Sequence, residues 1–287
     1  MINFAIPATG SSGHIGGGIL LAGLLGGFPA FLSIAAVLII QCLFFADGGL
    51  LALGCNIFNI GAVPCLLIYP LVFKPFLRGG IGYRRLTLAS VSASVLALEI
   101  GAFCVVIQTT LSGITALPFG AFSALMLPIH LVIGLVEGIV TAAVLCFIYK
   151  MRPEIIESSA AGERLGGVST KKALIALAVI TVAVGGVLSI FASANPDGLE
   201  WAVGKTAGNA LGGEAALGAG GAVFDEAASI QEGTAFLPDY AFAANPDDPA
   251  GAPASGLIGA GITFAIAGAA GFVINKTAKR KRAGTSG

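Results

Sequence analysis

Long apolar runs separated by short polar segments dominate the chain. Six runs come close to or exceed the roughly 20 residues that a helix needs to cross a bilayer, at 28–45, 49–73, 86–111, 119–149, 173–192 and 256–274. A shorter glycine-rich run at 15–25 suits a re-entrant or tilted helix packed inside the protein. The pattern predicts an all-α fold: a polytopic membrane helical bundle of about six or seven transmembrane helices, with a mostly irregular extracytoplasmic segment between the last two.

Composition indicates that lipid is the solvent. Of the 287 residues, 56% are hydrophobic and 10% are charged, and the mean hydropathy is +0.94. One soluble core cannot bury that much apolar surface, so we expect a multi-pass protein of the cell membrane. The formal net charge is zero, and we expect no nucleic-acid partner. The five cysteines stand singly in or beside the apolar runs, without the spacing of a zinc site.

The placement of charge predicts the orientation, because Lys and Arg near span ends stay in the cytoplasm. Fourteen of the 15 basic residues fall at 74–85, 150–172 and 276–282. The segment 195–255 carries nine acidic residues and a single lysine. We therefore expect 195–255 to be extracytoplasmic and the C-terminus to be cytoplasmic, which places the stretch GSSGHIGGG at 10–18 on the outer side.

His14 in this stretch is the first candidate ligand. A neutral imidazole at the outer mouth of a bundle suits a borderline metal ion, and the flanking glycines let backbone groups approach a ligand closely. A histidine that caps a helix or hydrogen-bonds within its own loop is the alternative that the residues leave open.

Polar side chains inside the apolar runs are the second group of candidates. An ionisable residue in a span costs free energy, so its presence there suggests a functional role. His130 and Glu137 are seven residues apart, two helical turns, and so share one face. Gly134 and Gly138 between them favour a close helix contact. The pair either ties two helices together or lies on a metal path. Glu99 and Gln108 raise the same question on another run.

Signatures of an enzyme are missing from the sequence. The stretch GLEWAVGKT resembles a phosphate-binding loop, but Leu199 stands where GxxxxGK[ST] requires glycine. HExxH does not occur, and two histidines leave little for a hydrolytic site. We expect a protein that is no enzyme, with no organic cofactor, and any ATP hydrolysis to belong to separate chains.

The first half of the chain resembles the CbiM/NikM family, the substrate-binding membrane components of energy-coupling-factor importers for cobalt and nickel. The stretches NFAIPATGSSGHIGG, QCLFFADGGLLALGCNIFNIG and HLVIGLVEGIVT are similar to the family's NFPIPGGTSGHL, QALLFGDGGLLALGANIFNMG and HALIGIGEGLIT. The second half resembles the small companion subunit CbiN/NikN, with the signature PDGLE. The resemblance divides the chain into a metal-binding membrane domain at 1–152, a cytoplasmic linker at 153–171 and a PDGLE region at 172–287.

The resemblance implies that His14, the histidine of the SGH motif, is a metal ligand. The family's other ligands come from a Met-His start, whose amine, backbone nitrogen and imidazole bind the ion. Here position 2 is Ile, so the family's first span and its Met-His start are not matched. We expect a start assigned too late; the alternative is a divergent or truncated form whose metal site is incomplete. Such an all-nitrogen site suits Co(II) or Ni(II), the transported substrate, over Mg(II) or Ca(II).

The family implies capture of the ion on the outer side and its release to the cytoplasm. The expected partners are the lipid bilayer, a transmembrane coupling subunit similar to CbiQ/NikQ and a pair of cytoplasmic ATPase subunits similar to CbiO/NikO. Candidates for the metal path or for contacts around the ligands are Ser11, Ser12, Asn56, Asn59, Glu99, Gln108, His130 and Glu137.

Two other functions stay open from the sequence. A structural or regulatory membrane subunit of the same importer would not itself bind metal. A channel or proton-coupled carrier would use Glu99, His130 and Glu137 as a relay and would need no ATPase. Genes for a coupling subunit and an ATPase beside this one would argue against the carrier.

Overall fold

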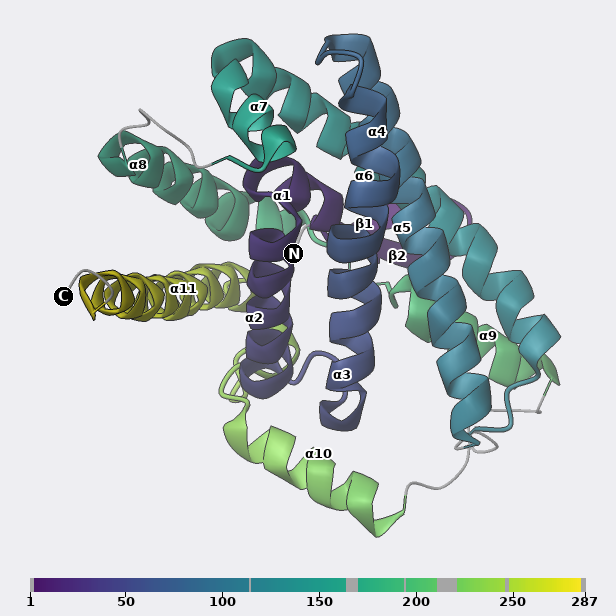
Figure 1. The fold of residues 1–287 in the computed structure, drawn as a ribbon. Coiled ribbons are helices and arrows are strands. Elements are labelled where there is room, and N and C mark those ends of the chain that lie inside the picture. The colour runs from purple at the N-terminus through teal and green to yellow at the C-terminus, as the bar shows by residue number, and fades with distance from the viewer. Residues whose placement is uncertain are drawn as a thin grey trace.

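A computed structural model describes residues 3–113, 115–163, 170–193, 195–210, 221–245 and 248–284. These residues form a bundle of helices with one small hairpin (Figure 1). The label η marks helices that are not α-helical: η1, η4 and η6 are 3-10 helices, and η2 and η3 are π-helices. In chain order the elements are β1 Asn3–Ile6, β2 Ser11–His14, α1 Gly18–Leu25, α2 Gly27–Phe45, η1 Leu50–Ala52, α3 Leu53–Asn56, η2 Ile57–Phe73, α4 Lys74–Leu77, α5 Tyr83–Ser112, α6 Phe119–Met151, α7 Pro153–Ala161, α8 Thr170–Thr181, η3 Val182–Val187, η4 Leu188–Phe191, α9 Gly198–Ala210, α10 Ala222–Thr234, η6 Pro238–Tyr240 and α11 Gly251–Gly284.

The long apolar runs are helices. Four are long and apolar enough to cross a bilayer: Gly27–Phe45, Leu50–Leu77, Tyr83–Ser112 and Phe119–Met151. Two shorter apolar helices, Ala178–Phe191 and Gly251–Ile266, fall in the last two predicted runs. The expected all-α polytopic bundle is confirmed, with four long spans and two shorter apolar helices in the described parts of the chain. The segment between the last two apolar helices, expected to be mostly irregular, instead carries the helices α9 and α10 in its described parts.

The glycine-rich run before the first span is α1, a short helix packed inside the bundle. Its Ile19 and Ala22 are fully buried. Gly18 at its start lies so close to Pro64 of η2 that an added Cβ would come within 2.7 Å of the proline ring. The expected internal packing of this run is confirmed.

Helices α5 and α6 approach closely through two glycines. A Cβ added at Gly134 would lie 3.0 Å from the Cα of Val95, and one at Gly138 would lie 2.8 Å from the Cα of Val91. The predicted GxxxG contact is therefore confirmed. It holds together two helices, α5 and α6, that both line one internal cavity.

A β-hairpin precedes the bundle, where the sequence analysis assigned no strand. β1 and β2 pair antiparallel, with Asn3 opposite His14, and the turn between them has positive φ at Ala8 and Gly10. The sequences of the two strands, NFAI and SSGH, do not alternate apolar and polar residues, so the pattern that indicates a half-buried strand is missing. The hairpin fixes His14 at the end of a paired strand.

The C-terminal region, residues 170–284, contacts the start of the chain and the end of α2. The amide of Ser12 donates to the carbonyl of Pro196 at 2.8 Å, and Ser12 pairs in parallel with Asp197. The indole of Trp201 in α9 donates to the carbonyl of Thr9 at 2.9 Å. Figure 1 shows α10 lying across the end of the bundle where α2 and α3 meet.

Candidate functional site

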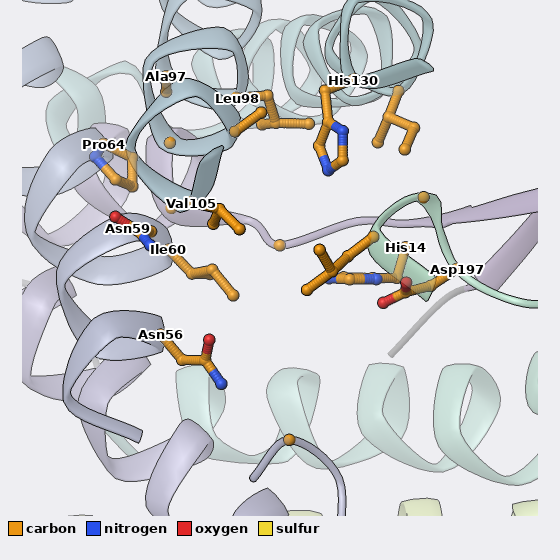
Figure 2. A pocket seen from close by; sticks show the side chains of 18 of the residues that line it. His14, Asn56, Asn59, Ile60, Pro64, Ala97, Leu98, Val105, His130 and Asp197 are labelled. Carbon is orange, nitrogen blue, oxygen red and sulfur yellow. The ribbon is translucent and has the colours of Figure 1, made fainter. Parts of the chain in front are cut away.

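A cavity of about 250 Å³ lies between the end of the hairpin, η2, α5, α6 and the start of α9. His14, Asn56, Asn59, His130, Glu137 and Asp197 all line it. Figure 2 shows apolar side chains on the same walls, among them Ile60, Leu98 and Val105. The space is therefore largely apolar, with a few polar groups converging on it, as is typical of a binding site.

His14 enters the cavity from the end of β2. Its side chain lies next to that of Asp197, which comes from the start of α9 (Figure 2). The parallel pairing of Ser12 with Asp197 holds these two backbone segments together. An imidazole and a carboxylate from distant parts of the chain thus share one corner of the cavity.

His130 faces the same corner from α6. Its Nδ1 lies 2.8 Å from the carbonyl oxygen of Met126. A carbonyl can only accept a hydrogen bond, so Nδ1 carries the proton in this contact, and Nε2 of the neutral ring keeps its lone pair. Figure 2 shows the ring pointing into the cavity toward His14 and Asp197.

Glu137 lies two turns further along α6 and is almost fully buried, with 2% of its surface exposed. Its Oε2 accepts a hydrogen bond of 2.9 Å from the amide of Gly16. The predicted shared face is confirmed, because His130 and Glu137 both line the cavity. The carboxylate therefore anchors the glycine-rich loop two residues after His14.

The amide side chains lie on the opposite wall. Asn56, the last residue of α3, and Asn59, near the start of η2, both line the cavity. Asn59 and Gln108 form a reciprocal pair, with Nδ2 to Oε1 at 2.7 Å and Nε2 to Oδ1 at 3.3 Å. Gln108 itself is not among the residues that line the cavity; it holds Asn59 in place from α5.

The remaining sequence candidates lie outside the cavity lining. Ser11 and Ser12 are fully buried, and the hydroxyl of Ser12 donates to the carbonyl of Asn195 at 2.8 Å. They attach the C-terminal region to β2. Glu99 on α5 is half-buried, and its Oε1 has no hydrogen-bond partner among the described residues.

Four residues with polar side chains line the cavity although the sequence did not single them out as site candidates: Gln41, Asp47, Asp197 and Glu200. Two of them form a capping box at the start of α9, where the amide of Glu200 donates to Asp197 Oδ1 at 2.8 Å and the amide of Asp197 donates to Glu200 Oε2 at 3.3 Å. The signal was present in PDGLE, because an acidic residue three positions before Glu is the capping-box spacing.

The donor set suits a borderline transition-metal ion, since imidazole nitrogens lie beside carboxylates and amides. Within the described residues, no group of three or more His, Cys, Asp or Glu side chains could hold a metal ion.

Comparison with known proteins places the chain in a family. Residues 1–155 match the CbiM model, described as the cobalt uptake substrate-specific transmembrane region, and residues 171–276 match the PDGLE domain. No solved structure matches the chain.

Three relatives illustrate the similarity. A protein of Archaeoglobus fulgidus that bears the name fused nickel transport protein NikMN is 38% identical over 179 residues, which cover 58% of this chain and 54% of that protein. A protein of Haloquadratum walsbyi named as a metal transport protein is 35% identical over 162 residues, covering 54% of this chain and 68% of the relative. The cobalt transport protein CbiM of Sorangium cellulosum is 29% identical over 153 residues, covering 53% and 68%.

The chain spans about half the length of the fused Archaeoglobus relative, 54%. The CbiM match covers more than half of the 287 residues, and the PDGLE match follows it. The chain therefore belongs to the CbiM family and carries a PDGLE domain after its CbiM region.

Proposed function

We propose that the chain is the substrate-capture component of an ATP-driven energy-coupling-factor importer for Co(II) or Ni(II), binding the ion on the outer side and passing it inward. The observation that carries the proposal is the position of His14, from the SGH stretch, on the wall of a cavity shared with His130 and Glu137 of a long apolar helix. The CbiM match and the relatives named for cobalt or nickel transport support it.

The chemistry of the walls supports nitrogen ligation. His14 would donate an imidazole nitrogen, and the Nε2 lone pair of His130 faces the same corner. Nitrogen donors favour Co(II) and Ni(II), whereas Mg(II) and Ca(II) prefer oxygen. Glu137 acts on the loop rather than on the ion, because its Oε2 is bonded to the amide of Gly16.

Partners and orientation complete the proposal. ATP hydrolysis belongs to a pair of cytoplasmic subunits similar to CbiO/NikO, which act through a transmembrane subunit similar to CbiQ/NikQ. The acidic segment 195–255 lies outside the cell membrane, where its carboxylates attract divalent cations, and the C-terminus lies inside. The working division is a metal-binding domain at 1–152, a linker at 153–171 and a PDGLE region at 172–287.

Isothermal titration of Co(II) and Ni(II) into the purified chain tests the proposal, with Mg(II) as the control ion. The chain and a form extended upstream to a Met-His start, where the reading frame provides one, are compared. We expect tight binding by at least one form and its loss in His14→Ala, while Glu226→Ala on the exposed surface of α10 binds like the unmodified chain. Failure of both forms to bind either ion would contradict the proposal.

Acid should weaken this binding, because an imidazole must be unprotonated to hold a metal ion. Repeating the titration from neutral pH down to about pH 5, across the range in which imidazoles take up a proton, should therefore show falling affinity. Affinity that is independent of pH would mean that no imidazole binds the ion.

One observation favours a second candidate, a structural or regulatory subunit that does not bind metal. The described residues hold no group of three or more His, Cys, Asp or Glu side chains suited to a metal ion. That function predicts no titration signal in either form, together with stable association with the coupling subunit. The two candidates therefore separate in the same titration.

A further inference from the structure

The outer segment of the C-terminal region meets the end of α2 at a hydrogen-bonded junction. The side-chain amide of Gln41 donates to the hydroxyl of Tyr240 at 2.7 Å and to Asp47 Oδ2 at 3.1 Å. The Tyr240 hydroxyl in turn donates to Asp47 Oδ2. The Tyr240 ring stacks on Phe45 with centroids 5.0 Å apart. One tyrosine thus joins two segments almost 200 positions apart in the chain.

A second side chain fastens the same turn. Nε2 of Gln231 in α10 donates to the carbonyl of Gly48 at 2.7 Å and to the carbonyl of Cys42 at 3.0 Å. Both carbonyls belong to α2 or to the turn after it, so residues from α10 and η6 hold this turn together.

Backbone strain gathers on both sides of the junction. Ala46 has φ 55° directly before Asp47, and Asp239 and Tyr240 have φ 50° and 61°. Non-glycine residues in the left-handed region cost of the order of 1 kcal/mol each and persist only where the surroundings hold them. The hydrogen bonds of Tyr240 and the stacking of its ring on Phe45 stabilise these strained conformations.

The turn held in this way is part of the cavity wall. Gln41, Asp47 and Gly48 all line the cavity. Gly48 lies against Asn56, because an added Cβ would come within 2.9 Å of the Asn56 amide nitrogen. A change in the conformation of this turn would therefore change the shape of the cavity wall.

We propose that Tyr240 is a positioning residue that holds the Asp47–Gly48 wall of the cavity closed, so that its hydroxyl sets how fast a bound divalent cation leaves. The inference rests on the proposed function, since it assumes that the cavity takes the cation. Tyr240 itself does not line the cavity; it acts through Asp47 and Gln41.

The electrostatics of the junction favour this role. Burial, and then the negative charge of Asp47, raise the pKa of Tyr240. The hydroxyl therefore keeps its proton at physiological pH and remains a donor to the carboxylate.

Two variants of the full-length chain test the inference. Tyr240→Phe keeps the ring stack on Phe45 and removes only the hydroxyl. Tyr149→Phe is the matched control, because its hydroxyl donates to the carbonyl of Ile81 at 3.1 Å, and neither residue lines the cavity. Each protein is loaded with Co(II) alone and chased with excess chelator while the absorption of bound cobalt is followed.

We expect Co(II) to leave Tyr240→Phe about tenfold faster, which corresponds to the loss of one hydrogen bond to a charged group. Tyr149→Phe should release Co(II) within about twofold of the unmodified rate, because the cavity wall is intact. Release from Tyr240→Phe at the unmodified rate would overturn the inference.

Hydrogen exchange on the metal-free chain separates this inference from the proposed function. The amides of Asp47 and Ala52, bonded to the carbonyls of Gln41 and Gly49, should exchange faster in Tyr240→Phe, whereas that of Ser12, bonded to Pro196, should not. Absence of Co(II) binding by the unmodified chain would refute the proposed function alone. Unchanged exchange at the turn would refute the closure of the wall, whether or not metal binds.

Discussion

Glu137 is a carboxylate buried in a membrane-spanning helix. Such a placement costs free energy, so an ionisable residue there is a candidate for a functional role. Its 2.9 Å bond from the Gly16 amide indicates that it fixes the loop that directly follows His14. Glu137→Ala leaves that amide unpaired, so we expect Ni(II) affinity to fall about tenfold or more. Glu137→Gln should lose less, because an amide oxygen can still accept the bond.

Titration calorimetry of the two Glu137 variants measures this difference, with the apo thermal midpoint recorded in parallel. A merely structural role would lower the midpoint of Glu137→Ala and leave the affinity of the folded protein unchanged. Equal Ni(II) affinity in Glu137→Ala, Glu137→Gln and the unmodified chain would contradict the anchoring role.

For single residues, the sequence predicts only those positions that the helical repeat itself determines, such as which side chains share a face of one helix. The seven-residue spacing was enough to place His130 and Glu137 on one face, and both reach the cavity. The pairing of Asn59 with Gln108 joins positions 49 apart, and no local pattern encodes it. The proximity of Asp197 to His14 was equally out of reach, because a contact between segments more than 180 positions apart leaves no periodic trace.

At the scale of elements, the α5–α6 contact depends on Gly138. Gly138→Ala puts a Cβ 2.8 Å from the Cα of Val91, and a backbone atom cannot move aside cheaply. We expect a loss of about 1–3 kcal/mol in stability, as for overpacking elsewhere. Gly120→Ala is the control in the same helix, since nothing lies within 4 Å of its added Cβ.

The midpoint of thermal unfolding in detergent should therefore fall in Gly138→Ala. It should stay level or rise in Gly120→Ala, because alanine favours the helix over glycine. A midpoint for Gly138→Ala equal to that of Gly120→Ala would show that the helices separate without cost.

The capping box of α9 makes a second prediction for an element. Asp197→Ala removes the acceptor of the Glu200 amide, which costs about 1 kcal/mol. Amides in the first turn of α9 should exchange about fivefold faster as the helix end frays, whereas Glu226→Ala on α10 should leave them unchanged. Equal exchange in both variants would show that the box contributes nothing to α9.

Helices and strands were predictable where a long, continuous pattern of hydropathy marks them in the sequence. The four long spans follow from hydropathy alone. The hairpin did not follow, because neither of its strands alternates apolar and polar residues. The sequence also did not predict the π-helical form of η2. Pro64 and Pro70 lie inside it and interrupt its backbone hydrogen bonding, because proline has no amide hydrogen to donate.

At the scale of the whole molecule, hydropathy gives the spans, but only tertiary contacts show how the C-terminal region attaches. It meets the start of the chain at Ser12 and Pro196 and the end of α2 at Asp47 and Tyr240. The first attachment brings Asp197 and Glu200 of the C-terminal region into the lining of the cavity, and the second contacts Gln41 and Asp47, which also line it.

The proposed orientation can be tested on the intact molecule with single cysteines. Asp225 on α10 and Arg84 at the start of α5 are both exposed, and they lie in the segments expected outside and inside the cell. In a background without Cys55, Cys104 and Cys146, Asp225→Cys should react with a membrane-impermeant maleimide on whole cells. Arg84→Cys should react only after the cells are opened, because the positive charges of 74–85 keep that end in the cytoplasm.

Cys42 and Cys65 can remain in this background, since both are buried. Labelling of Arg84→Cys on intact cells, with Asp225→Cys protected, would invert the topology. His14 and the acidic segment would then lie on the cytoplasmic side, which would contradict capture of the ion from outside. Reaction of Asp225→Cys alone would instead place His14, the acidic segment and the Tyr240 junction on the side from which an imported cation arrives.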